Sequence, residues 1–375
     1  MLWSYELPPD RIAQHPLTER DQARLLIYAQ GNITESTFLH LAQYLPEGAL
    51  LIYNDSKVVP ARLRQGNREF LLTRIEEGGW NQGSPQRWRG LFRPGKFWRK
   101  GEALVWEEAG VHLKVHWVGE ANEREGLFEV SWSPPQLSAL QVLERLGEVP
   151  LPPYVEREAS SEDRERYQTF FARLPGSVAA PTAGLHFTQA VLESLQRKGI
   201  MLYPVTLHVG IGTFLPIQRM EVPEEHEVGE EWFYVPLHTL MALRKASGPI
   251  VCVGTTSLRV IESLYWLGVL RLQGQNVIQV PKFPWKDLAS DMPASQALAA
   301  LPAPVRGTTA LYVLPGYPFK LVRGLITNFH LPGSTLLALV QAFIGLEGIQ
   351  KVYRYALEQG FRFLSYGDTS LLWRE

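Results

Sequence analysis

Apolar residues recur with two different spacings, which divide the chain into segments. Residues 37–45 repeat at helical intervals, and residues 49–53 form an apolar run that predicts a buried strand. Between about residues 65 and 149, apolar and polar positions alternate in short segments, at 69–75, 103–106, 111–118 and 126–132. Turn residues separate these segments, a pattern typical of a small antiparallel sheet or barrel.

From about residue 150, strands and helices are predicted to alternate. Apolar runs that end in polar or glycine residues, with helical periodicity beyond them, lie at 202–209, 250–253 and 324–328. This alternation predicts a sheet with crossover helices. We therefore expect an α/β main domain with an inserted antiparallel β-barrel domain. The main domain comprises residues 1–64 and 150–375, and the inserted domain comprises residues 65–149.

Composition is typical of a globular protein and indicates its cellular environment. The 375 residues are 45% hydrophobic and carry a formal net charge of −1, so bulk charge does not indicate a nucleic-acid partner. The single cysteine, Cys252, lies in an apolar run and fits a reducing, cytoplasmic setting. We expect no secretory signal, and the longest apolar stretch, 336–340, is too short to span a membrane. The charged segments 156–166 and 221–231 are expected on the surface.

Polar residues follow the predicted strands, where ligands bind in open α/β sheets. Glycines permit close backbone approach, cations and a helix N-terminus suit a carboxylate, and hydroxyl or amide groups suit a ribose. The candidate substrate-binding residues of these segments, and of the small-residue segment 176–186, are Asn54, Lys57, Arg62, Thr182, Gly210, Gly212, Thr213, Thr255, Thr256, Ser257, Arg259, Asn328, His330 and Ser334.

The same residues also have structural interpretations. The polar residues after position 53 suit a turn, and His208 alone suits a hydrogen-bonded core position. The hydroxyl residues after position 254 suit a helix cap, with Arg259 and Glu262 in a surface ion pair. The histidines show no short metal-ligand spacing, so no metal site is expected. No phosphate-loop or full dinucleotide glycine motif is present, which disfavours kinase, ATPase and nicotinamide chemistry.

Cations are concentrated between residues 62 and 100. Ten lysines and arginines stand there against three glutamates, and aromatic residues interleave with them. Cations beside aromatic rings suit phosphates and unstacked bases. A solvated β surface whose tryptophans belong to the core is an equally good interpretation. The RNA-binding candidates are Arg87, Arg89, Arg93 and Lys96.

Together these segments resemble one family, the S-adenosylmethionine:tRNA ribosyltransferase-isomerases of queuosine biosynthesis. The similarity extends from residue 7 to residue 368, with the most specific blocks at 20–26, 54–63, 167–169, 177–188, 206–214, 253–259 and 325–337. The family usually has a second histidine three residues after His226, where this chain has Gly229, and often has Gly-Asp where this chain has Gly48-Ala49.

The resemblance implies a substrate pair, S-adenosylmethionine and a tRNA carrying 7-aminomethyl-7-deazaguanine at the wobble position. The products would be epoxyqueuosine-tRNA, adenine and methionine. S-adenosylmethionine is consumed as a ribosyl donor, so no cofactor is expected. The implied partner is the tRNA anticodon arm, bound by the basic insert, and a monomer is favoured. An α/β domain with an inserted β-barrel is implied as well.

The implied chemistry needs a base to remove a C5′ proton beside the sulfonium. His208 is the first candidate and His186 the second, since a neutral imidazole accepts a proton near pH 7. Asp55 is the third catalytic candidate, and it or Asp368 would hold the ammonium or ribose hydroxyls. Arg259 with the 254–257 cap would hold the carboxylate. Tyr366 or Phe329 would face the sulfonium. The alternatives are a metal-dependent hydrolase and a non-catalytic RNA-binding protein, which zinc content and adenine release distinguish.

Overall fold

The computed structural model describes residues 2–98, 101–122, 125–210, 216–288 and 291–374. Its centre is a ten-stranded sheet in the order β15-β16-β13-β12-β3-β14-β17-β18-β1-β2. In that order the strands are Gln279–Val280, Val305–Thr309, Glu231–Val235, Met201–Leu207, Leu50–Asn54, Ile250–Val253, Val322–Asn328, Thr369–Trp373, Arg24–Ala29 and Asn32–Thr37.

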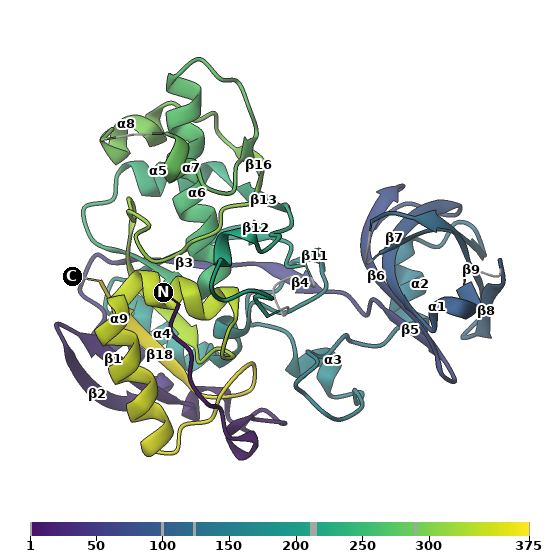
Figure 1. Ribbon diagram of the computed structural model, residues 1–375, viewed down its shortest axis with the longest axis horizontal. Coiled ribbons are helices and arrows are strands. Elements are labelled where there is room, and N and C mark those ends of the chain that lie inside the picture. Colours follow the sequence, from purple (N-terminus) through teal and green to yellow (C-terminus); the bar gives the residue numbers. More distant parts are fainter. Residues whose placement is uncertain (1, 99–100, 123–124, 211–215, 289–290, 375) are drawn as a thin grey trace.

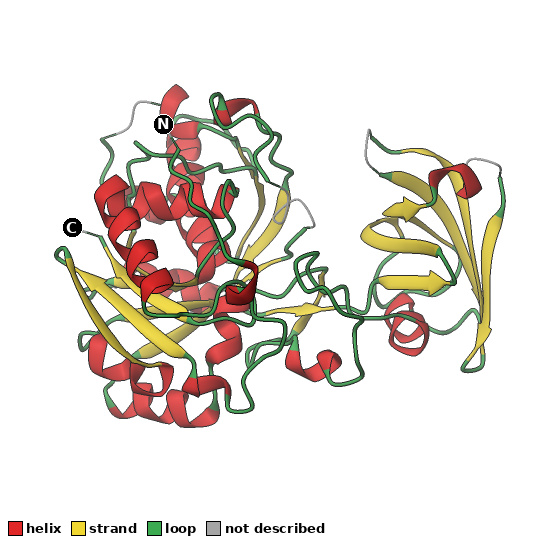
Figure 2. Cartoon of the chain, turned by 60° about the horizontal axis from the view of Figure 1, so that its bottom comes forward, coloured by secondary structure: helices red, strands yellow, loops and turns green. Residues whose placement is uncertain are grey.

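The four central strands β12, β3, β14 and β17 run parallel, and the outer strands are mixed. Alternate residues of these strands point to opposite faces, and both faces are covered. In β14, Ile250 and Cys252 join one core cluster, whereas Val251 and Val253 join another. Figure 2 shows helices on both sides of the sheet. The expected α/β organisation of the main domain is therefore present.

Two sets of helices form these outer layers. The larger core cluster contains residues of α5 (Leu237–Arg244), α6 (Gly254–Leu272), α8 (Ala294–Ala299) and α9 (Thr335–Glu358). The cluster on the other face contains residues of α4 (Gln189–Arg197) and of the 3-10 helix Phe38–Tyr44, where helical periodicity was expected. Short helices α3 (Asp163–Arg166) and α7 (Pro284–Asp287), a 3-10 turn at Thr182–His186, and the strand pair β4 (Ser56–Val58) and β11 (Leu174–Ser177) complete the domain.

A second, six-stranded antiparallel sheet stands apart from the first (Figure 1). Its order is β5-β6-β7-β10-β9-β8, with strands Arg62–Gln65, Arg68–Glu77, Gln86–Arg93, Gly126–Ser133, Val111–Glu120 and Ala103–Glu108. Side chains join its two edge strands, since Gln65 Nε2 donates to the Val105 carbonyl at 2.9 Å and Trp106 Nε1 donates to the Arg64 carbonyl at 3.1 Å. The sheet is thus nearly closed, as expected. Helices α1 (Gly95–Trp98) and α2 (Ala139–Leu146) accompany it.

The chain enters and leaves this second sheet at neighbouring points. Arg62 and Glu148 exchange two backbone hydrogen bonds, of 3.2 and 2.8 Å. Strand β5 begins at Arg62, so the second sheet starts three residues before position 65, the expected first residue of the insert.

Helix α9 is long and apolar enough to cross a membrane by length and composition alone. It has 24 residues, and half of its most apolar 18-residue window, which has a mean hydropathy of 1.3, is buried inside the protein. Leu337, Val340 and Phe343 of this helix belong to the main core cluster. A core helix passes the same length-and-composition test, so α9 is weak evidence for a membrane span.

Candidate active site

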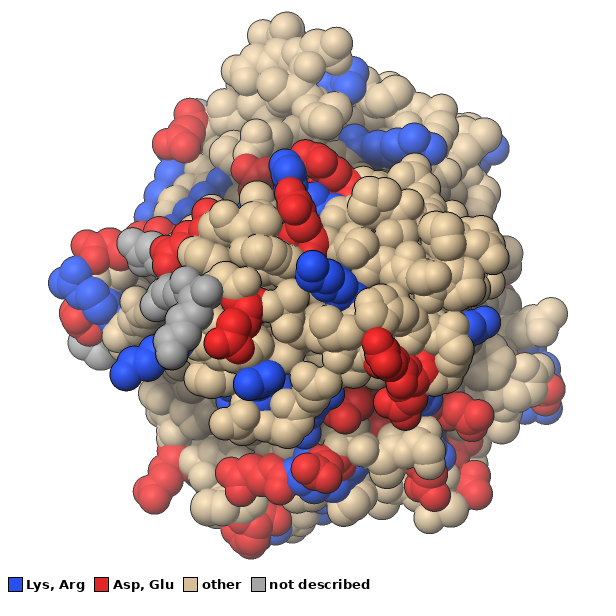
Figure 3. Space-filling model, turned by 90° about the vertical axis from the view of Figure 1, so that its right-hand side faces the viewer, with Lys and Arg blue, Asp and Glu red and all other residues tan. Residues whose placement is uncertain are grey.

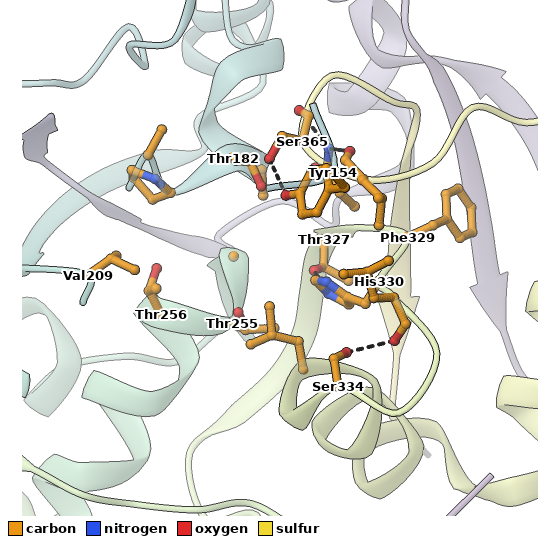
Figure 4. A pocket seen from close by; sticks show the side chains of 18 residues that line it. Tyr154, Thr182, Val209, Thr255, Thr256, Thr327, Phe329, His330, Ser334 and Ser365 are labelled. Atoms are coloured by element: carbon orange, nitrogen blue, oxygen red, sulfur yellow. Dashed lines mark hydrogen bonds between the residues drawn. The ribbon is translucent and has the colours of Figure 1, made fainter. Parts of the chain in front are cut away.

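A cavity lies at the carboxyl ends of the parallel strands, where polar loops were expected to meet (Figure 4). Val209 follows β12, Gly254 follows β14, and Asn328 ends β17. We call this hollow the strand-end cavity. Its lining residues are Tyr154, Ala180, Pro181, Thr182, Ala183, Val209, Gly254, Thr255, Thr256, Thr327, Asn328, Phe329, His330, Leu331, Ser334, Leu336, Leu364 and Ser365.

The N-termini of two long helices meet at this cavity. Helix α6 begins at Gly254, whose φ of +85° suits glycine, and no side chain caps its first turn. Thr255 and Thr256 line the cavity, and Thr256 Oγ1 is buried with no hydrogen-bond partner among the described residues. Helix α9 starts after Ser334, whose hydroxyl accepts from Leu337 N at 3.1 Å. Free N–H groups and the helix dipole favour an anion at the start of α6.

His330 lies on the cavity wall as a neutral imidazole. Its Nε2 is 2.8 Å from Thr327 Oγ1, and burial lowers its pKa from 6.5 to about 3. Asn328 lies beside it and links the cavity to His186, because Asn328 Oδ1 is 3.2 Å from His186 Nε2. Burial lowers the pKa of His186 to about 4. The predicted residues Asn328 and His330 are therefore brought together at one wall.

A second hollow adjoins the first and shares Leu336 with it. We call it the Arg259 cavity, and it is lined by Gly210, His226, Glu227, Val228, Gly229, Glu230, Glu231, Arg259, Leu311, Tyr312, Val313, Thr335, Leu336 and Leu339. Arg259 is bound here by Glu231 and donates from Nε to the Leu311 carbonyl at 3.1 Å. Glu231 starts β13, so the acidic segment 221–231 is not entirely a solvated loop. Arg259 therefore lines the neighbouring cavity and does not line the strand-end cavity beside the N-terminus of α6.

The expected surface pair between Arg259 and Glu262 is wrong. Glu262 is fully buried, and its carboxylate accepts from the backbone N–H groups of Lys320, Leu321 and Val322 at 2.9 Å each. Tyr317 Oη also donates to it at 3.0 Å. Burial raises the pKa of Glu262, opposed by these hydrogen bonds. The side chain holds the start of β17 against α6.

His208, the first candidate for the base, does not line the strand-end cavity. Its ring stacks on Trp232 with centroids 5.3 Å apart, and a Cβ at Gly176 would lie 2.8 Å from its Cε1. Neighbouring positions on an extended chain point to opposite sides, so Val209 reaches the cavity and His208 points away from it. Burial lowers the pKa of His208 to about 4.

Four other predicted site residues are engaged in structural hydrogen bonds. Both ends of the Asn54 amide bind the backbone of Leu207, at 2.9 and 3.0 Å, which joins β3 to β12. Asp55 accepts from Thr206 Oγ1 at 2.6 Å and from Arg173 at 2.9 Å. The two oxygens of Asp368 accept from the backbone N–H groups of Arg24 and Arg362, at 2.9 and 2.7 Å. The Ser257 hydroxyl donates to the Val253 carbonyl at 2.8 Å. Their polar groups serve the fold because each is aimed at a neighbouring strand or turn.

The remaining candidates lie elsewhere. Tyr366 lines a small third hollow with His186 and donates to Asp163 Oδ1 at 2.9 Å, and Asp163 is buried although segment 156–166 was expected on the surface. Arg62 pairs with Glu69 at 3.1 Å beside the inserted sheet, and Lys57 is half-buried in β4. Gly212 and Thr213 lie outside the described residues. Gly210 lines the Arg259 cavity and Thr182 the strand-end cavity.

The cations of the insert are paired more fully than local composition indicates. Arg87 lies 2.9 Å from Glu77, Arg89 lies 2.6 Å from Glu76, and Arg93 lies 2.6 Å from Glu69. Figure 3, which faces the inserted domain, shows blue and red side chains intermingled. Three glutamates from outside residues 62–100 add further pairs: Glu125 with Arg89, Glu129 with Arg87 and Glu148 with Arg64. Trp88 and Trp98 are fully buried, whereas Lys96 is exposed.

Several lining residues were not predicted. Tyr154 Oη and Ser365 Oγ lie 2.7 Å apart on one wall, and Thr327 contacts His330. Thr327 and Ser365 lie in the part of the sequence that resembles the family, and this resemblance could have identified them. Tyr154 follows a proline pair, and nothing in the sequence marked it as a site residue. Among the described residues, no three His, Cys, Asp or Glu side chains gather as a metal site, and the expectation of no metal remains a prediction.

A partly open, mostly apolar cavity with a few polar groups, placed between two helix N-termini at the strand ends of an α/β sheet, is typical of an enzyme that binds a small molecule. Comparison with known proteins agrees. The family model described as queuosine biosynthesis protein matches residues 1–372. The S-adenosylmethionine:tRNA ribosyltransferase-isomerase of Polynucleobacter asymbioticus is 39% identical, covering 99% of this chain and 97% of the relative. That of an Anaeromyxobacter species is 40% identical, covering 99% and 98%.

A crystal structure of S-adenosylmethionine tRNA ribosyltransferase from Thermotoga maritima is 31% identical, covering 98% of this chain and 99% of that one, with a TM-score of 0.49. The full-length matches show that the chain belongs to the queuosine biosynthesis protein family. The resemblance seen in the sequence is thereby confirmed, and so is the expected class of enzyme, a transferase and isomerase.

Proposed function

We propose that this enzyme transfers and isomerises the ribosyl moiety of S-adenosylmethionine onto 7-aminomethyl-7-deazaguanine at the wobble position of tRNA. The products are epoxyqueuosine-tRNA, adenine and methionine. The supporting observation is the strand-end cavity itself, in which an uncapped helix N-terminus and a neutral histidine face one hollow in a chain that matches this family over its full length.

The start of α6 binds the methionine carboxylate in this proposal. Its free N–H groups and the unpartnered Thr256 hydroxyl are the strongest anion donors on the cavity wall. The adjoining Arg259 cavity then accommodates another part of the same substrate, because the two hollows meet at Leu336. The substrate is consumed, so no resident cofactor is needed.

The reaction starts with removal of a C5′ proton beside the sulfonium. The resulting ylide opens the ribose and expels adenine, the aminomethyl nitrogen of the tRNA base attacks the ribosyl fragment, and closure of the epoxide releases methionine. The enzyme contributes a base, a proton for the departing adenine, and orientation of both substrates.

His330 replaces His208 as our candidate for the base. It lines the cavity as an unprotonated imidazole at neutral pH, although the burial that lowers its pKa also makes it a weaker base, so this assignment rests on its position. His186 remains the second candidate; it does not line the cavity, and its Nε2 contacts Asn328 on the cavity wall. Asp55 is not proposed as a base, since Arg173 and Thr206 occupy its carboxylate.

The tRNA anticodon arm is proposed to contact the inserted domain as well. Lys96 is exposed, and the Arg93 side chain remains 69% exposed in its pair with Glu69, so both offer cations to phosphates. A cytoplasmic monomer is the proposed working form.

The direct test incubates the purified chain with S-adenosylmethionine and tRNA bearing the aminomethyl base, and follows free adenine by chromatography. We expect adenine release that requires both substrates and is insensitive to a zinc chelator. Binding of tRNA without adenine release would instead indicate an RNA-binding protein, and stoichiometric zinc with hydrolysis of small molecules would indicate a hydrolase.

A further inference from the structure

A partly exposed row of three parallel rings and one guanidinium group lies next to the two cavities. It consists of His208, Trp232, Tyr234 and Arg306, and we call it the aromatic row. The planes of His208 and Trp232 are within 15° of parallel with centroids 5.3 Å apart, and those of Trp232 and Tyr234 are within 3° at 6.3 Å. The Arg306 guanidinium carbon lies 5.6 Å from the Tyr234 centroid. Strand pairing explains the row, because Tyr234 is opposite Arg306 across β13 and β16.

The row occupies a face of the sheet that helices leave open. The alternate residue Phe233 points to the other face, where it joins the core cluster that includes residues of α6. Figure 1 shows α5, α6 and α8 on one side of β13 and β16, with the inserted domain beyond the other side. Trp232 is 40% exposed, which is unusual for a residue that contacts ring neighbours. Among the described residues, Trp232 and its two ring neighbours therefore form a partly exposed aromatic platform.

The charges of this face favour a polyanion. Arg306 is exposed, and the Arg173 side chain is 64% exposed although its partner Asp55 is only 3% exposed. Asp55 lies under Thr206, and Thr206 is opposite Tyr234 across the sheet, so this cation borders the aromatic row. Two accessible guanidinium groups therefore flank the rings, while the neighbouring carboxylate is buried. Rings for bases and cations for phosphates are the combination used by proteins that bind single-stranded nucleic acid.

The row also leads directly to the cavities. His208 ends it, the next residue, Val209, lines the strand-end cavity, and Gly210 lines the Arg259 cavity. His208 rests on Gly176, where any side chain would collide with the ring. The anchoring strand β11 continues towards Ala180 and Thr182 of the strand-end cavity. A nucleotide stacked on Trp232 is therefore placed beside the entrance to the site.

We propose that the aromatic row stacks unpaired bases of the RNA substrate that flank the base being modified. This inference rests on the proposed function and specifies how its RNA is held, on the main domain and not only on the insert. The lowered pKa of His208 supports it, since the ring stays neutral at pH 7 and stacks without a charge to desolvate.

The test measures binding of a fluorescent anticodon stem-loop RNA and of a fully paired RNA duplex of equal length. Trp232→Ala should weaken stem-loop binding roughly 5- to 100-fold, the range for loss of one base stack. Trp232→Phe should restore most of the affinity, and duplex binding should change less than twofold. Leu272→Ala is the matched control, because Leu272 is 49% exposed at the other end of α6.

Arg306→Gln is a second variant, for the case that Trp232→Ala destabilises the chain. Arg306 is exposed, and we expect its replacement to lower the stem-loop affinity a few-fold. Stem-loop affinity within twofold of wild type for both variants, or an equal loss on the duplex, would overturn the inference. Adenine release by the wild-type enzyme is measured in parallel. If adenine release is absent, the proposed function is wrong. If adenine is released and both variants bind the stem-loop normally, only the proposed role of the aromatic row is wrong.

Discussion

At the scale of single residues, two asparagines in similar sequence settings differ in whether they reach a cavity. Asn54 and Asn328 both end central strands of the sheet. Each amide binds backbone groups, Asn54 those of Leu207 and Asn328 the Leu364 carbonyl at 2.9 Å, but Asn328 also lines the cavity and contacts His186. The sequence predicts that such polar groups gather at the strand ends, because strand direction follows from the α/β pattern. It does not predict which of them lines a cavity, because that depends on loops distant in the sequence.

The histidines give the sharpest test at this scale. His330→Gln should lower kcat for adenine release about 100-fold or more, because it removes the only imidazole on the described wall of the strand-end cavity. His208→Gln should mainly raise KM for tRNA and change kcat less than about tenfold. Both are measured at saturating S-adenosylmethionine over a range of tRNA concentrations. The reverse order of kcat values would return the base to His208.

At the scale of elements, the central strands were predictable and the outer ones were not. Segments 202–209, 250–253 and 324–328 correspond to β12, β14 and β17, because buried parallel strands read as continuous apolar runs. Strand β13 was missed, since Glu231 and the acids before it resemble a loop. Strand β7 was missed as well, because its arginines alternate with core residues and were interpreted only as charge. Both missed strands carry charged residues, so charge hides their strand pattern, whereas the other alternating segments of the inserted sheet were predicted.

Two glycines at opposite ends of α6 make a matched pair. Gly254 has a φ of +85° and Gly274 a φ of +82°, so alanine at either position should cost about 1–2 kcal/mol in the free energy of unfolding. Only Gly254→Ala should also weaken S-adenosylmethionine binding, by about tenfold or more, because it displaces the N–H groups of the first turn. Urea unfolding and calorimetric titration separate the two effects. Equal affinities in the two variants would exclude the α6 N-terminus as the carboxylate site.

At the scale of the whole molecule, charge is balanced by pairing over long sequence distances. The insert concentrates cations between residues 62 and 100, yet Glu125 and Glu129 are brought to Arg89 and Arg87 by strand β10 and the turn before it. A local count overstates the free positive charge for this reason. The division into an α/β domain with an inserted β-barrel domain was, in contrast, predicted from composition and from the alternating segments, and the two separate sheets are consistent with it.

Three buried histidines make stability depend on pH. Burial lowers the pKa of His186 and His208 to about 4 and of His330 to about 3, below the ordinary 6.5. The unfolded chain therefore binds more protons than the folded chain between these values, so stability is complete above about pH 6.5 and falls as the pH approaches 4.

Each histidine contributes up to about 1.4 kcal/mol per pH unit in that window. Urea unfolding at pH 5 and pH 7 measures the slope, and His186→Gln should reduce it. His40→Gln, at an exposed position, is the control. A slope that the control reduces as much as His186→Gln does would contradict burial as the cause.

The paired backbone at Arg62 and Glu148 has a consequence for the evolution and engineering of this fold. Because the two crossings are hydrogen-bonded neighbours, a peptide of a few residues joining position 61 to position 149 would reseal the main domain without stretching a strand. The inserted domain is therefore attached at one point of the main domain, by two adjacent chain segments. A protein of this fold can in this way acquire, lose or exchange the inserted domain while the geometry of the main domain is kept.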